Sequence, residues 1–495
     1  MILKYISIFL VLSFVNTLSR YPILVIISYD AFRYDYFNSN QTPYIRDFFK
    51  KGVSAHHISS VMPTKTFPNH FSIATGLYAD VHGVVGNKIY DSKLKEIIGN
   101  SYEMYHYNDQ VEPIWIRNEK AAFDRHSGVM MWPGGEFAYQ NVNPTFKKSW
   151  NISVTMTERI DTVMNWINHP ETPANLIFLY YEQPDDVAHV DGIFSERFNK
   201  TLTDLDYFTK YFDDQLKIHG IYDRVNVIHL SDHGMINYKY ENIINITQNL
   251  DPNSYKLAGS SPFLHVIPNQ DNEVEIYENL KNLSQVNKHF QVLRRNELPD
   301  SWHLKKTNRC PPLIAMADPG YAFQDVLDLI NKYAKNRTIN SLSEFGSHGY
   351  ENTELSMAGY FMARGPGFKK NYRVPPFKNI DLYHLFCAIL QISPAKNNGS
   401  FHNIEPILVL PADEGENNIL SLLFVFVGGA ILTIICLGCV GYAMLCLMKG
   451  KKESENISRA EKRYTSDLDM AMVALKQRKN REAQQLLISD SGESS

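Results

Sequence analysis

The sequence predicts an α/β fold with a mostly parallel central sheet, helices on both faces of that sheet, and one C-terminal transmembrane helix. Three short, almost continuously apolar runs support the sheet, because strands buried on both faces of a parallel sheet have this composition. Segments with helical spacing alternate with these runs, as is typical of a parallel sheet covered by helices. A long uncharged run near the C-terminus supports the membrane helix.

The expected strands span residues 23–28, 176–181 and 225–230. Helical spacing covers 157–168 and 202–218, and the second of these helices is expected to stop at His219-Gly220. A further helix is expected to open around Thr66, because Pro68 would then lie in its first turn, where proline is favoured.

The two ends of the chain predict a membrane-anchored protein. Residues 1–19 join Lys4 to an apolar run that ends in small residues, which favours a cleaved signal peptide over a buried first strand or an N-terminal anchor. Residues 419–448 carry no charge and can cross a bilayer, and three lysines follow within four residues. We therefore expect a single-pass type I protein at the cell surface. Its parts would be a signal peptide at 1–19, an extracellular domain at 20–410, a stalk at 411–418, the membrane helix at 419–448 and a cytoplasmic tail at 449–495.

The polar tail is expected to be disordered except for a helix over 467–487, and its role stays open.

The formal net charge of −4 lacks the basic excess of a nucleic-acid binder, so no nucleic acid is expected as a partner beyond substrate ends. Only two of the five cysteines, Cys310 and Cys387, lie in the expected outer domain, which excludes a disulfide scaffold and leaves their pairing open. Oligomeric state is also open. Seven sequons predict glycosylation of the outer domain, at Asn40, Asn151, Asn199, Asn245, Asn282, Asn336 and Asn398.

Acids follow all three expected strands, histidines follow the second and the third, and one further histidine lies in the loop-like segment Gly346–Gly349. In open α/β sheets the ligand crevice lies at the carboxyl ends of the strands, so these side chains are expected to converge. Any one of them alone could be a capping Asp or a loop His with ordinary partners. Together they suit two zinc ions about 3.5–4 Å apart, an arrangement typical of phosphoryl displacement. The six candidates are Asp30, Asp185, His189, Asp232, His233 and His348.

Thr66 is the candidate nucleophile. A hydroxyl at this point would stand at the positive end of the expected helix. Coordination to a metal activates a weak hydroxyl nucleophile, so a zinc-bound Thr66 could attack phosphorus near neutral pH. Its alternative role is that of the helix N-cap.

Six ordered motifs over residues 22–400 together resemble the ecto-nucleotide pyrophosphatase/phosphodiesterase family of the alkaline-phosphatase-like superfamily, and in particular its short, type I anchored members. The motifs are Asp30 after a strand, Pro63–Asn69 around Thr66, His82–Asn87, Glu182–Asp185, Ser231–Met235 and His348–Tyr350.

The resemblance implies an alkaline-phosphatase-like fold and two zinc sites. One zinc would be held by Asp185, His189 and His348, and the other by Asp30, Thr66, Asp232 and His233. Asn87 would donate its amide to a non-bridging phosphate oxygen. Ala188 stands where the family usually has Gly, and Ile193 where Pro is common, but neither replaces a ligand.

Substrates in that family divide into nucleotides and choline-bearing esters. Phe67 follows the nucleophile and could stack on one face of a nucleobase, and the resemblance makes Trp150 a candidate for the other face. The sequence therefore favours a hydrolase that cleaves ADP, ATP or dinucleoside polyphosphates to nucleoside 5′-monophosphates through a Thr66 phosphoryl-enzyme. The alternatives are a choline-phosphodiester or lysophospholipid phosphodiesterase and a catalytically quiet adhesion or receptor ectodomain. Which nucleotide is preferred stays open.

Overall fold

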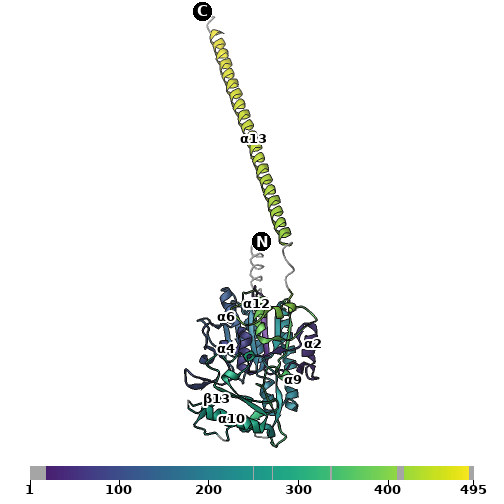
Figure 1. Cartoon of the computed structure of the whole chain (residues 1–495). Coiled ribbons are helices and arrows are strands. Elements are labelled where there is room, and N and C mark those ends of the chain that lie inside the picture. The colour runs from purple at the N-terminus through teal and green to yellow at the C-terminus, as the bar shows by residue number, and fades with distance from the viewer. Residues whose placement is uncertain (1–17, 249, 270, 335–336, 410–416, 490–495) are drawn as a thin grey trace, which may run out of the picture. The chain divides into compact units, whose positions relative to one another are not determined.

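The computed structural model describes residues 18–248, 250–269, 271–334, 337–409 and 417–489 (Figure 1). The chain divides into two units, Met1–Leu410 and Pro411–Ser495. Nearly all of the expected signal peptide, most of the expected stalk and the sequon at Asn336 lie outside the described residues.

An eight-stranded sheet forms the centre of the first unit, in the order β19-β2-β18-β9-β1-β8-β6-β7. β1 lies between β8 and β9 and runs parallel to both, so that Leu24 is opposite Leu176 on one side and Asn226 on the other. β18 is antiparallel to β9 and β2, which makes the sheet mixed but mostly parallel. The strands span β1 Ile23–Tyr29, β2 Val53–Ala55, β6 Ser127–Met130, β7 Phe146–Lys148, β8 Leu176–Tyr181, β9 Val225–Leu230, β18 Phe361–Arg364 and β19 Tyr372–Val374.

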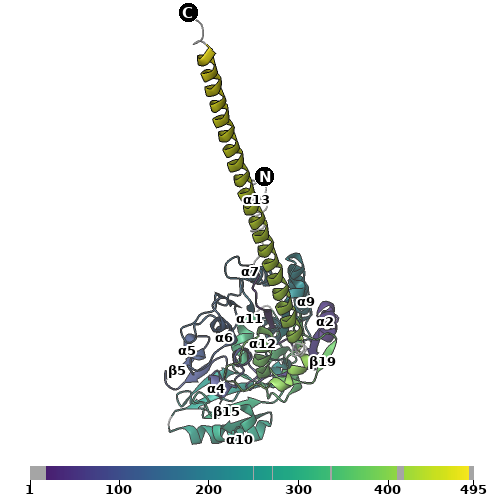
Figure 2. The same ribbon diagram turned by 90° about the horizontal axis from the view of Figure 1, so that it is seen from above.

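Helices cover both faces of this sheet, as adjacent residues of β1 demonstrate (Figures 1 and 2). Successive side chains of a strand point to opposite faces. Ser28 bonds to His70 of α3, whereas Tyr29 bonds to Thr209 of α9. The expected α/β fold is therefore confirmed. One set of contacting helices comprises α3 Thr66–Thr75, α6 Ile114–Ala121 and α12 Leu382–Leu390, and the other comprises α2 Pro43–Lys51, α7 Met156–Ile167 and α9 Glu196–Ile218.

The three expected strands are confirmed, and β1 continues one residue further, to Tyr29. All seven side chains of β1 are buried, which explains its unbroken apolar sequence. The two expected helices are also confirmed. α7 begins at a capping box in which Thr155 and Glu158 satisfy each other's backbone amides, and α9 begins six residues before the expected start, behind the N-cap Ser195.

A second, antiparallel sheet in the order β12-β13-β15-β14 lies at the foot of Figure 1, with α10 packed on it. It has its own apolar core and was not predicted. Its elements are β12 Tyr255–Ser260, β13 Phe263–Pro268, α10 Glu273–Asn287, β14 Phe290–Arg294 and β15 Leu313–Ala317. The shorter elements are β3 Ile58–Ser59, α4 Ala79–His82, β4 Ile89–Asp91, β5 Glu96–Ile98, α5 Tyr102–Tyr105, α8 Asp185–Asp191, β10 Ile236–Lys239, β11 Ile243–Ile244, β16 Ala322–Phe323, α11 Val326–Tyr333, β17 Glu344–Ser347 and β20 Phe377–Lys378.

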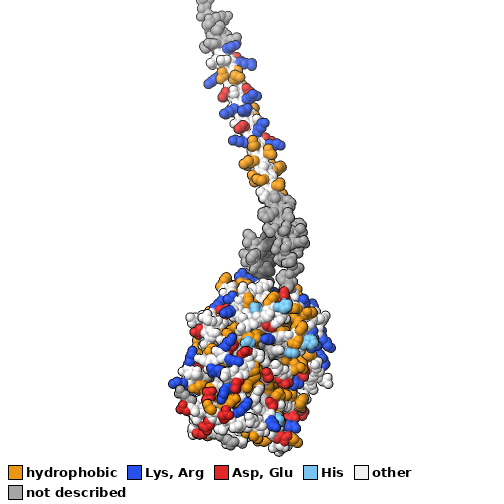
Figure 3. Space-filling view, in the orientation of Figure 1, with side chains coloured by type: hydrophobic (Ala, Val, Ile, Leu, Met, Phe, Trp, Pro, Cys, Tyr) orange, Lys and Arg blue, Asp and Glu red, His pale blue; other side chains and the backbone are white. Residues whose placement is uncertain are grey.

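The second unit is one helix, α13, which spans Asn417–Ser489. Among the described residues it alone provides a stretch long and apolar enough to cross a membrane, by length and composition. Along its described side chains, apolar groups give way to charged ones toward the C-terminus (Figure 3). The helix expected over 467–487 lies within α13, but the expectation of disorder in the rest of the tail was wrong for residues 449–466, where the helix is continuous. The tail is rich in strong helix formers, and Arg478 pairs with Glu482 one turn later.

The structure shows the surroundings of the predicted glycosylation sites and of the two cysteines whose pairing was left open. Each described sequon asparagine is exposed, and Asn151 and Asn245 form turns with their own Ser153 and Thr247, which leaves room for a glycan. Glycosylation itself stays a prediction. Cys310 and Cys387 are both buried free thiols.

Candidate active site

The topology brings the six predicted ligands to one edge of the central sheet. Because β1, β8 and β9 are parallel, the residues that follow them meet at their carboxyl ends. Asp30 follows β1 directly, Asp185 opens α8 behind β8, and Asp232 lies two residues after β9. β17 pairs with β10 and opposes Ser347 to Ile236, which places His348 beside the chain that leaves Asp232.

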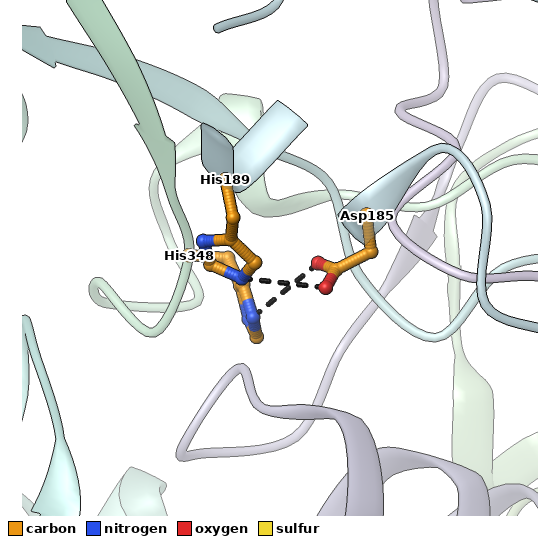
Figure 4. A group of neighbouring side chains, drawn as sticks. All are labelled: Asp185, His189 and His348. Atoms are coloured by element: carbon orange, nitrogen blue, oxygen red, sulfur yellow. Dashed lines mark ion pairs between the residues drawn. The ribbon is translucent and has the colours of Figure 1, made fainter. Parts of the chain in front are cut away.

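Asp185, His189 and His348 form the first group (Figure 4). Asp185 and His189 lie four residues apart on α8 and therefore share one face of the helix. The Nε2 atom of His189 lies 3.3 Å from one carboxylate oxygen of Asp185, and the Nε2 atom of His348 lies 3.5 Å from the other. Each carboxylate oxygen of Asp185 thus lies near one imidazole, and both rings lie on the same side of the carboxylate (Figure 4).

Asp30, Asp232 and His233 form a second group around the hydroxyl of Thr66. The Nε2 atom of His233 lies 3.0 Å from Asp232 Oδ2, 3.5 Å from Asp30 Oδ1 and 3.5 Å from Thr66 Oγ1. Ligand atoms of Asp30, Asp185 and His233 all lie within 4.8 Å of one another, so the two groups adjoin. Apart from His189 and Asp185, whose side chains are 25% and 11% exposed, each of these side chains is at least nine-tenths buried.

The hydrogen bonds of the three histidines leave one nitrogen of each free for a cation. Their Nδ1 atoms lie 2.8–2.9 Å from the backbone carbonyls of Gly346, Gly234 and Thr64. A carbonyl only accepts, so each Nδ1 carries a proton, and Nε2 is the nitrogen of each ring that can offer a lone pair to a cation. That lone pair faces a carboxylate oxygen, which is also an acceptor. A metal cation between the two satisfies both, and a histidine that binds a metal usually donates its other ring N–H to a carbonyl, as these three do.

The carboxylates support the same conclusion. Asp30 Oδ1, Asp185 Oδ1 and Asp232 Oδ2 are buried, and none accepts a hydrogen bond from the described residues. Burial and the neighbouring charges of Asp232 and Asp185 raise the pKa of Asp30 well above its usual range. Burial opposes the ionisation of Asp232 too, but His233 and His70 hold its pKa well below its usual range. Bound cations would compensate these buried negative charges, so the donor set fits a metal centre.

Thr66 is the first residue of α3, and its side chain is 6% exposed. Lys65 occupies the N-cap position, so the alternative that Thr66 is the N-cap is wrong. The hydroxyl stands at the positive end of the helix, where developing negative charge is stabilised. The Thr66 carbonyl accepts a hydrogen bond from His70 Nδ1 at 2.9 Å.

Asn87 is oriented by the residue next to the nucleophile. The Phe67 backbone N–H donates to Asn87 Oδ1 at 2.9 Å. The amide nitrogen of Asn87 makes no hydrogen bond to the described residues and is free to donate to a bound anion. The arrangement fits the expected role of Asn87 as an oxyanion donor.

The two aromatic candidates differ in their surroundings. The half-buried ring of Phe67 lies 6.3 Å from the ring of Tyr105. Trp150 is 49% exposed and follows β7 by two residues. β7 is parallel to β6, and β6 to β8, so Trp150 lies at the same edge of the sheet as Asp185. It is therefore on the correct side of the molecule for a substrate contact.

Sequence reasoning missed the residues that orient the site. Tyr180 Oη donates to Asp30 Oδ2 at 2.6 Å, and His70 Nδ1 lies 3.3 Å from Asp232 Oδ2. His70 follows Thr66 by four residues, so helical spacing could have placed it on the face of the nucleophile. Tyr180 gave no such signal, because an aromatic residue in a buried strand has the pattern of ordinary core.

Comparison with known proteins agrees with this geometry. The family model described as type I phosphodiesterase / nucleotide pyrophosphatase matches residues 24–351. The bis(5′-adenosyl)-triphosphatase ENPP4 of Homo sapiens is 32% identical over 422 residues, which cover 85% of this chain and 88% of that protein. Ectonucleotide pyrophosphatase/phosphodiesterase family member 5 of Homo sapiens is 33% identical over 392 residues, which cover 78% of each chain.

A solved structure of murine ectonucleotide pyrophosphatase/phosphodiesterase 5 has the same fold, with a TM-score of 0.70 and 32% identity. The match covers 79% of this chain and 100% of that one, an inactive threonine-to-alanine variant in complex with AMP. The chain therefore belongs to the type I phosphodiesterase/nucleotide pyrophosphatase family and is a hydrolase of that class.

Proposed function

We propose that the chain is a cell-surface, two-zinc hydrolase that cleaves nucleotides such as ADP, ATP and dinucleoside polyphosphates to nucleoside 5′-monophosphates. The observation that carries the proposal is the position of the Thr66 hydroxyl, 3.5 Å from His233 Nε2 at the junction of the two Asp/His groups. A buried hydroxyl at this junction has the surroundings that activate a nucleophile.

The proposed ligand sets follow the two groups. Asp185, His189 and His348 would hold one zinc, and Asp30, Thr66, Asp232 and His233 the other. Mixed carboxylate and imidazole donors suit this ion. When bound, the zinc ions supply Lewis-acid stabilisation of negative charge and favour the ionised form of Thr66.

In the proposed reaction, Thr66 Oγ1 attacks the α-phosphorus of the nucleotide and displaces phosphate, pyrophosphate or a nucleotide in line. The new ester links Thr66 to a nucleoside monophosphate. Asn87 donates its amide N–H to a non-bridging oxygen, an interaction that strengthens as charge develops in the transition state. Water then hydrolyses the ester, releases the 5′-monophosphate and regenerates the Thr66 hydroxyl.

Three observations support a type I topology at the cell surface. α13 contains a stretch able to cross a membrane, lysines follow the uncharged run at once, and the described sequons are exposed on the first unit.

Phe67 and Trp150 are proposed to hold the nucleobase between them. Both are aromatic. Phe67 is next to the nucleophile in sequence, and Trp150 lies at the edge of the sheet.

The test is product analysis on the full-length protein in detergent, with diadenosine triphosphate, ADP, ATP and glycerophosphocholine, with and without a zinc chelator. AMP released in a chelator-sensitive manner is expected. Thr66→Ala should abolish turnover, whereas Thr66→Ser should retain part of it, and acid quenching with an α-labelled nucleotide should trap label on the wild-type chain. Phosphocholine as the sole product, or full activity of Thr66→Ala, would overturn the proposal.

A further inference from the structure

We propose that Thr64 and Lys65, the two residues before the nucleophile, form a positioning clamp that sets His348 relative to Thr66. This inference rests on the proposed roles of His348 as a metal ligand and Thr66 as the nucleophile. The clamp joins the chain that leads into α3 to the loop His348–Tyr350, which follows β17.

Three hydrogen bonds make up the clamp. His348 Nδ1 donates to the Thr64 carbonyl at 2.8 Å, and Lys65 Nζ donates to the His348 carbonyl at 2.6 Å. Thr64 Oγ1 donates to the Tyr350 carbonyl at 2.7 Å. The imidazole and the backbone of His348 are therefore held from the same two residues, and all four residues are at most 3% exposed.

Burial of the Lys65 ammonium group is unfavourable in free energy. Burying an ammonium group costs several kcal/mol unless it is well compensated. Among the described residues Lys65 forms no ion pair, and its Nζ donates to two carbonyls, those of His348 and Ser261, at 2.6 and 2.7 Å. Charge-assisted bonds of this kind are shorter and stronger than neutral ones. An uncharged residue would fill the space at lower cost, so the bonds that Lys65 makes account for its presence.

Gly349 leaves space for the Lys65 side chain. A Cβ atom at position 349 would lie 2.4 Å from Lys65 Cε and 2.7 Å from Nζ, and the backbone φ of +116° already disfavours other residues. The close approach lets the ammonium reach the carbonyl of the preceding residue, His348. The clamp thus gives a physical reason for glycine directly after the histidine.

The consequence is that the segment that leads into the nucleophile also holds a metal ligand in place. Thr66 follows Lys65 directly in sequence, so the distance between its hydroxyl and the imidazole of His348 depends on the clamp. Loss of a partner that orients a metal ligand typically weakens metal binding by 10–100-fold. Lys65 and Thr64 contact neither phosphorus nor leaving group in this scheme and are positioning residues.

The test compares Lys65→Met and Thr64→Val, which keep the side-chain size and remove the donors. Zinc bound per full-length chain in detergent is measured by atomic emission across a range of buffered free zinc concentrations. Lys65→Met is expected to weaken the site that contains His348 by about 10–100-fold. Thr64→Val should weaken it less, because the bond that it removes ends on Tyr350, whereas the bond lost in Lys65→Met ends on His348 itself. In cobalt-loaded protein, the visible spectrum of Lys65→Met should differ from that of the wild type.

Arg309→Met is the matched control. Arg309 is another buried cation that donates to backbone carbonyls, those of Gly83, Met104 and Glu103, away from the metal ligands, and unlike Lys65 it also pairs with a carboxylate, that of Asp91 at 2.8 Å. Its loss should lower the melting temperature without changing zinc affinity. Wild-type zinc affinity in both Lys65→Met and Thr64→Val would overturn the clamp, and if Lys65→Met does not fold, Thr64→Val decides. A wild-type chain that binds no zinc would instead refute the proposed function.

A second comparison uses the fit between positions 65 and 349. Gly349→Ala should weaken zinc binding in the wild-type background, because the new Cβ displaces the lysine. In a Lys65→Ala background the same change should have a smaller effect, because the side chain that it strikes is gone. Equal effects in both backgrounds would refute a role for the Lys65–Gly349 contact.

Discussion

The imidazole rings of His233 and His348 stack with 3.7 Å between their centroids and 12° between their planes. Each ring belongs to a different Asp/His group, so the stack joins the two groups into one site. Burial, followed by the charge of His233, holds the pKa of His348 well below its usual range, which keeps that ring neutral. The Nε2 atoms of both rings are directed at carboxylates.

Metal removal should destabilise the folded chain. Without a cation, buried carboxylate oxygens face imidazole lone pairs, and this repulsion weakens the fold around the site. At a free zinc concentration 1,000 times the dissociation constant, one bound ion adds about 4 kcal/mol to the free energy of unfolding. Chelation of the full-length protein should therefore lower its melting temperature, and added zinc should restore it at two ions per chain. An unchanged melting temperature after verified metal loss would contradict the assignment, as would restoration at one ion.

Replacement of Asn87 should reduce kcat more than it changes KM. Loss of one oxyanion donor typically lowers kcat by about 10²–10³-fold. Asn87→Asp is the sharper variant, because it keeps the acceptor that binds the Phe67 N–H and puts a negative oxygen where the amide donor was. We expect Asn87→Asp to be slower than Asn87→Ala in steady-state assays with ADP. Near wild-type kcat in Asn87→Asp would exclude the donor role.

Tyr180→Phe should weaken metal binding without disrupting the sheet. The lost bond is the one from Tyr180 Oη to Asp30 Oδ2, and its loss should reduce zinc affinity by about 10–100-fold. Tyr29→Phe is a matched control, since it removes a buried tyrosine bond to Thr209 on the opposite face of the sheet. The control should lose about 1 kcal/mol of stability and no zinc affinity. Zinc titrations monitored by atomic emission compare the two, and equal losses of affinity would show that Tyr180 acts only through stability.

Phe67→Ala and Trp150→Ala should affect nucleotides selectively. Stacking on an aromatic side chain contributes about 1–3 kcal/mol per base, which corresponds to roughly 5–150-fold in KM. The same variants should cleave a phosphodiester without a nucleobase at close to the wild-type rate. Steady-state comparison of ATP with such an ester measures the difference. A similar loss on both esters would indicate that these residues support the fold around Thr66 rather than contact the base.

The central sheet and the convergence of the Asp and His side chains at its edge were predictable from sequence because their signals are local. β8 and β9 are almost continuously apolar runs with acids close behind them, a pattern typical of buried parallel strands. The second sheet was missed because it depends on pairs between residues far apart in the sequence, as in β13 with β15, and no local pattern shows such pairing. The partners of the ligands were missed for the same reason. Lys65 and His348 lie 283 residues apart, and no local pattern joins them.

Acid should destabilise the metal-free fold through three buried histidines. Burial is the first cause in each case, and it lowers the pKa of His82 and His229 to about 3 and that of His265 to about 4. The unfolded chain protonates these rings near pH 6.5, whereas the folded chain does not, so the stability present above pH 6.5 is lost as the pH falls toward 4. Three such groups give a slope of up to about 4 kcal/mol per pH unit.

His229 tests this account most directly, because neither of its ring nitrogens has a hydrogen-bond partner among the described residues. His229→Leu should reduce the acid slope by about a third and match or exceed wild-type stability at pH 7.5, because it removes buried polar atoms that have no partner. Urea unfolding midpoints from pH 7.5 to 4.5, in chelator throughout, measure the slope. His402→Leu is the control, because His402 is exposed and should leave the slope unchanged. If His229→Leu and His402→Leu have the same slope as the wild type, burial of His229 does not contribute to the acid sensitivity of the fold.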